Sequence, residues 1–301
     1  MTVFTINQAF FAYEASRCRL PSVKKKGEYQ KFKNLSEISD QFDVFFLDAF
    51  GVLNIGDRPI AGVPERVAML QKQEKKVIVV SNAAGSPQQI MVDRFRSFGY
   101  KFESDDIITS RLAMLKGLSG LSGIEFGIMA NEDYGKEGLE ALKIKFLADD
   151  PGLYDSVQAF ILLASNSWTE NRQLLLEASL KKIPRPIYVG NPDIIAPHQD
   201  FISLEPGHFA HRIADSTGIS PCFFGKPFLN IYELAFARLG GRVSRDRILM
   251  VGDSLHTDIL GAQNAGIKSA LISGFGFFSK GGFEQGIQKS QIFPDFILEQ
   301  P

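Results

Sequence analysis

The stretch FDVFFLDAFGVL, residues 42–53, is the clearest indicator of the fold. Its apolar run, Val44–Leu47, stops at Asp48, and Gly51 follows three residues later. Consecutive apolar residues without alternation are typical of a strand that is buried on both faces of a sheet. A glycine just beyond the strand permits a tight turn and a close approach of the backbone. The stretch therefore predicts a buried strand whose tip carries a carboxylate.

The same pattern, a short apolar run followed by polar residues, returns further along the chain. Helix-like segments separate these runs. One of them, Pro227–Leu239, has proline in its first turn and glycine just past its end, as helices prefer. Strands that alternate with helices predict a doubly wound α/β fold with a parallel, Rossmann-like sheet. The further predicted strands are Val77–Val80, Ile187–Val189, Ile248–Val251 and Ala270–Ile272.

Polar side chains follow four of these strands where each strand ends. Ligands of open parallel sheets bind outside the carboxyl ends of the strands, so these side chains should share one site. Turn chemistry would explain one or two such positions, but their recurrence on four strands favours a common site. The residues are Asp48, Ser81, Asn82, Asn191, Asp193 and Asp253.

The pattern of the chain changes between residues 106 and 182. Glycine-rich turns there surround one strand-like run, Ala159–Ala164, and one helix, and prolines 184 and 186 then mark a boundary. In the N-terminal part, Asn7–Ser16 predicts an amphipathic helix that packs on the core. We therefore expect a core domain at 39–105 and 183–301, an inserted α/β cap domain at 106–182, and an N-terminal extension at 1–38.

Composition and charge limit the classes of function. The chain has 33 Lys and Arg against 34 Asp and Glu, a formal net charge of −1, so no overall positive field attracts nucleic acid or an anionic membrane. Its apolar runs are too short to span a bilayer, and its N-terminus lacks the pattern of a signal peptide. Cys18 and Cys222 are isolated, which suits a reducing compartment. We expect a cytoplasmic protein.

Three carboxylates are expected to meet at the predicted sheet edge. Asp48 and Asp253 stand at strand tips, and Asp258 enters the helix after the second tip. Neighbouring carboxylates repel one another unless a cation lies between them, and a ligand set made of oxygens suits Mg²⁺. The hydroxyl of Ser81 and the ammonium of Lys226 are groups that neutralise and position a phosphoryl group. The pattern predicts a magnesium site beside a phosphoryl site.

Four motifs in order resemble those of the haloacid dehalogenase superfamily. They are DAFGVL (48–53), VVSNAAGSP (79–87), FFGKP (223–227) and VGDSLHTDI (251–259). The inserted segment lies between the second and third motifs, and VGNPD (189–193) precedes the third. This arrangement is similar to the branch with a large α/β cap, which includes nucleotide and sugar-phosphate phosphatases. The resemblance covers roughly residues 40 to 275, and four ordered motifs are far more specific than any one of them.

The resemblance implies roles in catalysis and phosphate binding for four matching residues. Asp48 would be the nucleophile that forms an aspartyl-phosphate. Ser81 would bind the phosphate, with Asn82 beside it. Lys226 would bridge the phosphate and Asp48.

The resemblance also implies a metal shell. Asp48, Asp253 and the backbone carbonyl of Phe50 would hold Mg²⁺. Asp258 would orient these ligands, Asp193 would brace the site where the chain returns from the cap, and Gly51 would support the turn.

Position 50 departs from the family pattern. Family phosphatases carry a second Asp two residues after the nucleophile, which protonates the leaving group and then activates water. Phe50 cannot do this, and such a step typically contributes about 10²–10⁴-fold to the rate. The chain thus resembles large-cap members that have an aromatic residue there. We expect an impaired or altered acid–base step, with His256, His198 or a cap carboxylate such as Asp133 as replacement candidates.

Three functions remain open. The favoured one is a Mg²⁺-dependent phosphatase that acts on a small phosphate ester of the sugar-phosphate or nucleotide class. The second is a retired enzyme that binds a phosphorylated metabolite. The third is a metal-independent, dehalogenase-like hydrolase. Dehalogenases carry an aromatic residue at the position of Phe50, but the retained Asp253 and Asp258 count against a reaction without metal. Because large-cap relatives often dimerise through the cap, a homodimer is a further expectation.

Overall fold

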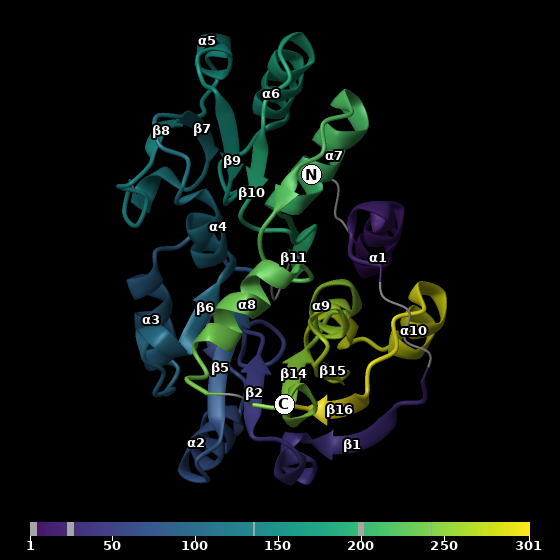
Figure 1. Ribbon diagram of the computed structural model, residues 1–301. Helices are drawn as coiled ribbons and strands as arrows, with labels where there is room; N and C mark the ends of the chain where they lie inside the picture. The colour runs from purple at the N-terminus through teal and green to yellow at the C-terminus, as the bar shows by residue number, and fades with distance from the viewer. Residues whose placement is uncertain (1–4, 23–26, 135, 198–201, 242) are drawn as a thin grey trace.

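The structure is a computed structural model that describes residues 5–22, 27–134, 136–197, 202–241 and 243–301. It has two halves, each built on a parallel sheet, which lie one above the other in Figure 1. In the described ranges we find no helix with the length and apolarity needed to cross a bilayer.

The lower half contains a seven-stranded sheet in the order β1-β16-β15-β14-β2-β5-β6. Every neighbouring pair in this sheet is parallel. The strands are β1 Gln30–Asn34, β2 Val44–Leu47, β5 Lys76–Ser81, β6 Ile107–Thr109, β14 Ile248–Gly252, β15 Lys268–Ile272 and β16 Phe296–Gln300.

Helices cover both faces of this sheet, which explains the unbroken apolar runs of the sequence. Along β2, Phe45 and Leu47 pack with α2 and α3, whereas Val44 and Phe46 pack with α4, α8 and α9 on the other face. A strand buried on both faces has no position for a polar residue until it ends. The helices are α2 Val63–Lys72, α3 Gln88–Ser97, α4 Ser110–Leu118, α8 Leu229–Ala237 and α9 Leu260–Ala265.

The upper half contains a five-stranded sheet in the order β13-β10-β9-β7-β8, which is also parallel throughout. Its strands are β7 Glu125–Met129, β8 Lys143–Phe146, β9 Ala159–Leu162, β10 Ile187–Val189 and β13 Cys222–Phe223. Its helices are α5 Pro151–Asp155, α6 Glu170–Lys182 and α7 Pro206–Thr217.

Six further elements lie outside the two large sheets and the helices named above. Two short antiparallel pairs are formed by β3 Asn54–Ile55 with β4 Arg58–Pro59, and by β11 Ile195–Pro197 with β12 Ile202–Leu204. The predicted N-terminal helix is α1, Ile6–Ala15, and α10, Phe283–Ser290, lies near the C-terminus.

The boundaries of the second sheet differ from those predicted. We expected the chain to return to the core at residue 183, but β10 and β13 both pair within the upper sheet. Conversely, β6 begins at Ile107, inside the expected insertion, and pairs with β5 of the core. Short buried parallel strands have the same composition in either sheet, so the sequence pattern could not assign them.

The core sheet changes its winding direction between β2 and β14. From β2 the order runs outward through β5 and β6 on one side, and from β14 through β15 and β16 on the other. Loops on the two sides diverge at such a point and leave a crevice at the carboxyl ends of the strands. Asp48 and Asp253 directly follow these two strands.

The first turn of α7 packs tightly on the segment that returns from β10. The Gly207 N–H donates to the Asp193 carbonyl at 3.0 Å. A β-carbon at position 207 would lie 2.1 Å from the Pro192 carbonyl oxygen and 2.5 Å from that of Asp193. Only glycine permits this approach, which helps to place Asp193.

We expect Gly207→Ala to lower the free energy of unfolding by about 1–3 kcal/mol, because backbone atoms must move to admit the methyl group. Urea denaturation measures this change. Gly120→Ala is the matched control, since a β-carbon there has no neighbour within 4 Å. Equal effects of the two substitutions would contradict the tight packing.

Candidate active site

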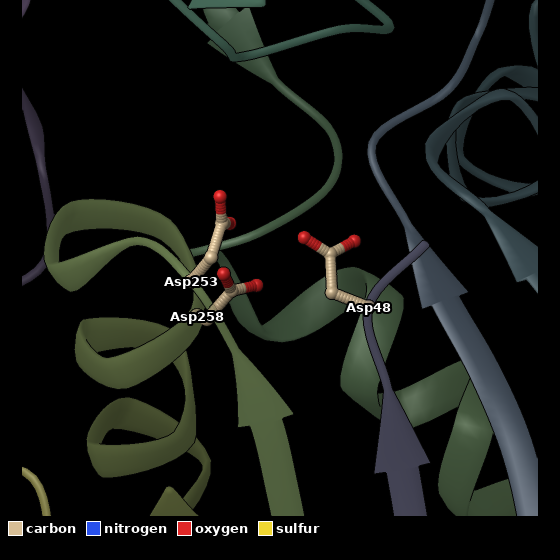
Figure 2. A group of neighbouring side chains, drawn as sticks. All are labelled: Asp48, Asp253 and Asp258. Carbon is tan, nitrogen blue, oxygen red and sulfur yellow. The ribbon is translucent and has the colours of Figure 1, made fainter. Parts of the chain in front are cut away.

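Three carboxylates converge at the crevice, as Figure 2 shows. Asp48 and Asp253 come from the tips of β2 and β14, and Asp258 lies in a π-helical turn, Leu255–Ile259. One oxygen of each lies within 4.8 Å of the others. The structure therefore brings together the three carboxylates that the sequence singled out.

Asp258 is fixed beneath the other two. Its side chain is fully buried, and its Oδ2 accepts the Ser254 N–H at 3.1 Å. A β-carbon at Gly252 would lie 2.1 Å from the Asp258 carboxyl carbon, so this strand end must be glycine. The π-helical turn sets the carboxylate back towards the strand, a use for which such turns are known at functional sites.

Asp253 is enclosed by backbone on two sides. The Phe277 N–H donates to its Oδ2 at 2.7 Å. Gly51, with φ of +76°, and Gly276, with φ of +65°, pass so close that β-carbons would lie 2.6 Å and 1.9 Å from that oxygen. The tight turn predicted at Gly51 thus also makes room for the carboxylate. Gly276 and Phe277 were missed, because nothing in their own pattern points to the site.

Lys226 is the cation of the site. Its ammonium lies 2.6 Å from Asp48 Oδ1 and 2.7 Å from Asp258 Oδ1, and its side chain is 2% exposed. Burial alone would lower the pKa of Lys226, but the charges of Asp258 and Asp48 outweigh it and raise that pKa above its ordinary value. Lys226 therefore stays charged and links the nucleophile candidate to the buried Asp258.

One ammonium does not neutralise three carboxylates. Burial, and then the charge of Asp258, raise the pKa of Asp48 to about 7, and burial raises the pKa of Asp253 well above its ordinary value. Both shifts mean that the cluster lacks positive charge. Carboxylates this close and this poorly compensated fit a divalent cation bound between Asp48 and Asp253.

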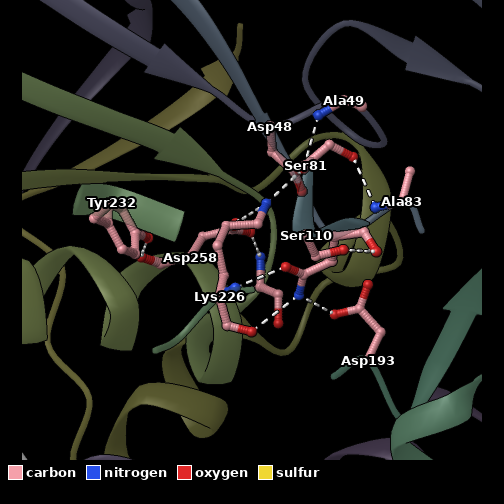
Figure 3. Close-up of polar contacts among 11 residues, drawn as sticks. Asp48, Ala49, Ser81, Ala83, Ser110, Asp193, Lys226, Tyr232 and Asp258 are labelled. Carbon is pink, nitrogen blue, oxygen red and sulfur yellow. Dashed lines mark hydrogen bonds and ion pairs between the residues drawn. The ribbon is translucent and has the colours of Figure 1, made fainter. Parts of the chain in front are cut away.

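Asn82 connects the cluster to the chain that returns from the upper half (Figure 3). Its Nδ2 donates to Asp193 Oδ1 at 2.8 Å and to the Lys226 carbonyl at 2.9 Å, and its Oδ1 accepts the Lys226 N–H at 2.7 Å. Asn82 therefore positions the backbone of Lys226. Burial is the main cause that raises the pKa of Asp193 to about 7.

A cavity of about 870 Å³ lies between the two sheets. Its floor contains Asp48, Ser81 and Asn82, and Asp193 borders it from the return segment. The Ser81 hydroxyl is nearly buried and accepts the Ala83 N–H at 3.2 Å. A second cavity of about 70 Å³ lies on the side of Asp253 and Lys226. A small ligand in the larger cavity, between the halves, could thus reach Asp48.

Phe50 borders both cavities, at the position where a titratable group was expected. Among the described residues, two of the three predicted substitutes do not replace it. His256 is buried against α1, where its Nε2 contacts Glu14 Oε1 at 2.5 Å, and Asp133 is exposed and borders neither cavity. His198 lies outside the described residues.

Several residues around the cavities escaped sequence reasoning. Glu205, just before α7, accepts from Ser203 Oγ at 2.6 Å and from Asn191 Nδ2 at 3.1 Å, and burial raises its pKa. No motif marks it or the others, because each comes from a segment whose place at the site depends on tertiary contacts. They are Tyr13, Arg94, Trp168 and Glu205.

Comparisons with known proteins agree with this geometry. A family model described as haloacid dehalogenase-like hydrolase matches residues 45–135, and one described as HAD-hydrolase-like matches residues 223–299. The chain belongs to the haloacid dehalogenase-like hydrolases. The two matches contain all three clustered carboxylates and Lys226 of this hydrolase.

Relatives cover most of the hydrolase. The chain is 25% identical over 265 residues to phosphoglycolate phosphatase 1A, chloroplastic, of Arabidopsis thaliana, which covers 81% of this chain and 72% of that protein. A possible sugar phosphatase from Cytophaga hutchinsonii superposes with a TM-score of 0.80 at 25% identity, over 91% of this chain and 98% of that one.

A third relative was solved in complex with magnesium. It is the glycerol phosphate phosphatase of Mycobacterium tuberculosis, with a TM-score of 0.64 at 22% identity, over 78% of this chain and 68% of that one. At this identity the likeness concerns the fold.

We expect Lys226→Met to destabilise the metal-free hydrolase, because two buried carboxylates lose their cation. The loss should be about 3 kcal/mol at pH 8 and smaller at pH 5. The sign follows from linkage: carboxyls whose pKa is raised bind more protons in the native state, so stability falls as the pH rises from about 4 to above 7.

Urea unfolding in EDTA at the two pH values measures this difference. Lys182→Met, which removes an exposed ion pair with Asp155, is the matched control and should cost about 0–1 kcal/mol. A loss for Lys226→Met that does not depend on pH would show that the carboxylates are not the cause.

Proposed function

We propose that the protein is a Mg²⁺-dependent phosphatase that acts on a small phosphate ester through an aspartyl-phosphate at Asp48. The observation that carries this proposal is the buried ammonium of Lys226, held between Asp48 and Asp258. Lys226 borders the cavity of about 70 Å³, and Asp48 borders both that cavity and the one of about 870 Å³. This arrangement orients a carboxylate oxygen and provides positive charge where a phosphoryl group would meet it.

In the first step, a free oxygen of Asp48 attacks phosphorus, and the bond from phosphorus to the leaving oxygen breaks. The leaving oxygen takes a proton from water, which becomes hydroxide, and the phosphoryl group remains on Asp48. In the second step, a water molecule attacks phosphorus and gives a proton to that hydroxide, the bond to the Asp48 oxygen breaks, and inorganic phosphate departs. Lys226 neutralises charge on the phosphoryl oxygens, and Ser81 donates a hydrogen bond to one of them.

The residues present fit a magnesium ion. Asp48, Asp253 and the carbonyl of Phe50 would hold it, with Asp258 and Asp193 as supporting carboxylates. When bound, the ion supplies the positive charge that the cluster lacks and neutralises the phosphoryl group. The magnesium complex of the glycerol phosphate phosphatase supports this assignment.

Phe50 implies a reaction that depends on the leaving group. It cannot supply a proton, so an alkoxide must take one from water, whereas a nitrophenolate leaves without one. We therefore infer slow turnover of alkyl phosphates. Substrates of the sugar-phosphate or nucleotide class suit the 870 Å³ cavity, and the relatives named for phosphoglycolate, sugar and glycerol phosphate substrates support a small ester.

Two other functions are tested by the same experiments. Phe50 is the observation that favours a retired enzyme that binds a phosphorylated metabolite. A dehalogenase-like reaction needs no metal, and the buried excess of carboxylates at Asp253 and Asp258 argues against it.

We propose further that the upper half acts as a cap, that it can mediate a homodimer, and that the protein works in the cytoplasm.

Wild-type protein with Mg²⁺ should hydrolyse at least one member of a panel of phosphate esters, and p-nitrophenyl phosphate is the first candidate. Asp48→Asn should abolish this activity, because an amide cannot form the phosphoryl bond. Phosphate release measures both. Asp43→Asn, at the surface, is the control and should keep full activity. Absence of any turnover that depends on Asp48 would favour the binding-only function.

Phe50→Asp should raise kcat on alkyl phosphates, by up to about 10²-fold, and much less on p-nitrophenyl phosphate. The reason is that only the alkoxide requires a proton as it leaves. Steady-state kinetics on glycerol phosphate and p-nitrophenyl phosphate measure the two changes, with Phe50→Asn as the control of similar shape. Equal changes on both esters would mean that Phe50 has another role.

A further inference from the structure

The N-terminal helix α1 reaches the active site. Its start is fixed by a capping box between Thr5 and Gln8, and its buried face consists of Ala9, Phe10 and Tyr13. This face packs on Leu255 and Ile259 after β14, on Phe277 after β15, and on Ile194 in the return segment. In Figure 1 the helix lies at the junction of the two halves.

The side chain of Tyr13 is held on two sides. Its ring stacks on His256, with centroids 5.0 Å apart and an interplanar angle of 8°, and its hydroxyl oxygen accepts the Ile194 N–H at 3.1 Å. Glu14 holds the other side of His256 at 2.5 Å. Tyr13 is only 3% exposed, so these contacts leave its hydroxyl little freedom.

The hydroxyl proton of Tyr13 has no acceptor within the described part of the chain. The side chain borders the 70 Å³ cavity together with Asp48, Lys226 and Asp253. Burial, and then the charge of Asp193, raise the pKa of Tyr13 well above its ordinary value, so the group stays a donor at every physiological pH. A buried donor without an acceptor is costly unless a ligand or water provides one.

The volume of the cavity allows such a ligand. About 10–15 Å³ of free space of this kind holds one water molecule, so 70 Å³ accepts several solvent-sized groups. Among its neighbours, Lys226 is a cationic donor and Asp48 is the proposed nucleophile. Tyr13 and Asp48 border the same cavity, so a ligand bound there can contact both residues.

We propose that Tyr13 donates a hydrogen bond to a phosphoryl oxygen at Asp48, so that the N-terminal helix completes the phosphoryl-binding site. This inference rests on the proposed function. It gives the extension a role in ligand binding that helix packing alone would not require, since a phenylalanine would pack on His256 equally well.

Tyr13→Phe should weaken the binding of orthovanadate, measured by calorimetry in the presence of Mg²⁺, about tenfold to hundredfold, as expected for a lost hydrogen bond to a charged group. Phe10→Leu is the control. It loosens α1 beside His256 but keeps the hydroxyl, so it should lower the melting temperature and leave vanadate affinity within about twofold of wild type.

A second measurement uses the full-length wild-type protein labelled with 3-fluorotyrosine. The chain has 7 tyrosines, and the resonance that is absent in Tyr13→Phe identifies Tyr13. It should shift when Mg²⁺ and orthovanadate are added together. If none of the wild-type fluorine resonances moves on vanadate binding, the proposal is overturned even where Tyr13→Phe fails to fold.

Tyr13→Phe with lower stability but unchanged vanadate affinity would overturn the proposal and leave the phosphatase function intact, because the hydroxyl would then serve only Ile194. A wild-type protein that neither binds vanadate nor hydrolyses any ester would overturn both the Tyr13 proposal and the proposed function.

Discussion

The ion pairs of Lys226 are the interaction on which the rest of the site depends. A buried ammonium lies between two carboxylates that approach it to 2.6 and 2.7 Å, and neither side is stable in a buried site without the other. The surrounding structure holds these three side chains in place. Asn82 fixes the backbone of Lys226, Gly252 leaves room for Asp258, and the winding of the core sheet brings the two strand tips together.

The site is assembled from three parts of the chain that are distant in sequence. The core sheet provides the carboxylates, and the return segment provides Asp193, which contacts Asn82. The N-terminal helix provides Tyr13, whose hydroxyl contacts the same return segment at Ile194. Because α1 also packs on the turn after β14, it touches both halves near the cavity. Movement of the upper half would therefore change the contacts of α1 with Ile194 and of Asn82 with Asp193.

Residue 50 differs from the family pattern, whereas the charged residues around it match that pattern. Phe50 borders both cavities. Compared with the Asp that family phosphatases carry at this position, it lacks a titratable group but still lies beside the site. The charge arrangement for holding a phosphoryl group is unaffected, since Phe50 carries none of it. In the proposed reaction, the step that concerns the leaving group would be the one changed, and the nature of that group would then govern the rate.

The pattern of apolar residues predicted helices and strands well where burial of one or both faces alone determines the pattern. Buried parallel strands at β2, β5 and β14, and the helix at α1, follow from apolar runs and periodicity. Asp48 and Asp253 follow from strand ends, and Asp258 follows from the helix start after the second of them. The assignment of β10 to the core was wrong, because a buried parallel strand pairs equally well in either sheet. Gly276 and Tyr13 could not be predicted, since their relevance lies in contacts more than 20 residues away.

The amino-acid sequence by itself thus determined the class of fold and the kind of chemistry, because both depend on which residue types stand at strand ends. Tertiary structure alone decided which side chains complete the site and what it can enclose. Burial, and then the charge of Asp258, raise the pKa of Asp48, and the meeting of two sheets creates the cavity. Both are properties of distances between separate segments, which no local pattern contains.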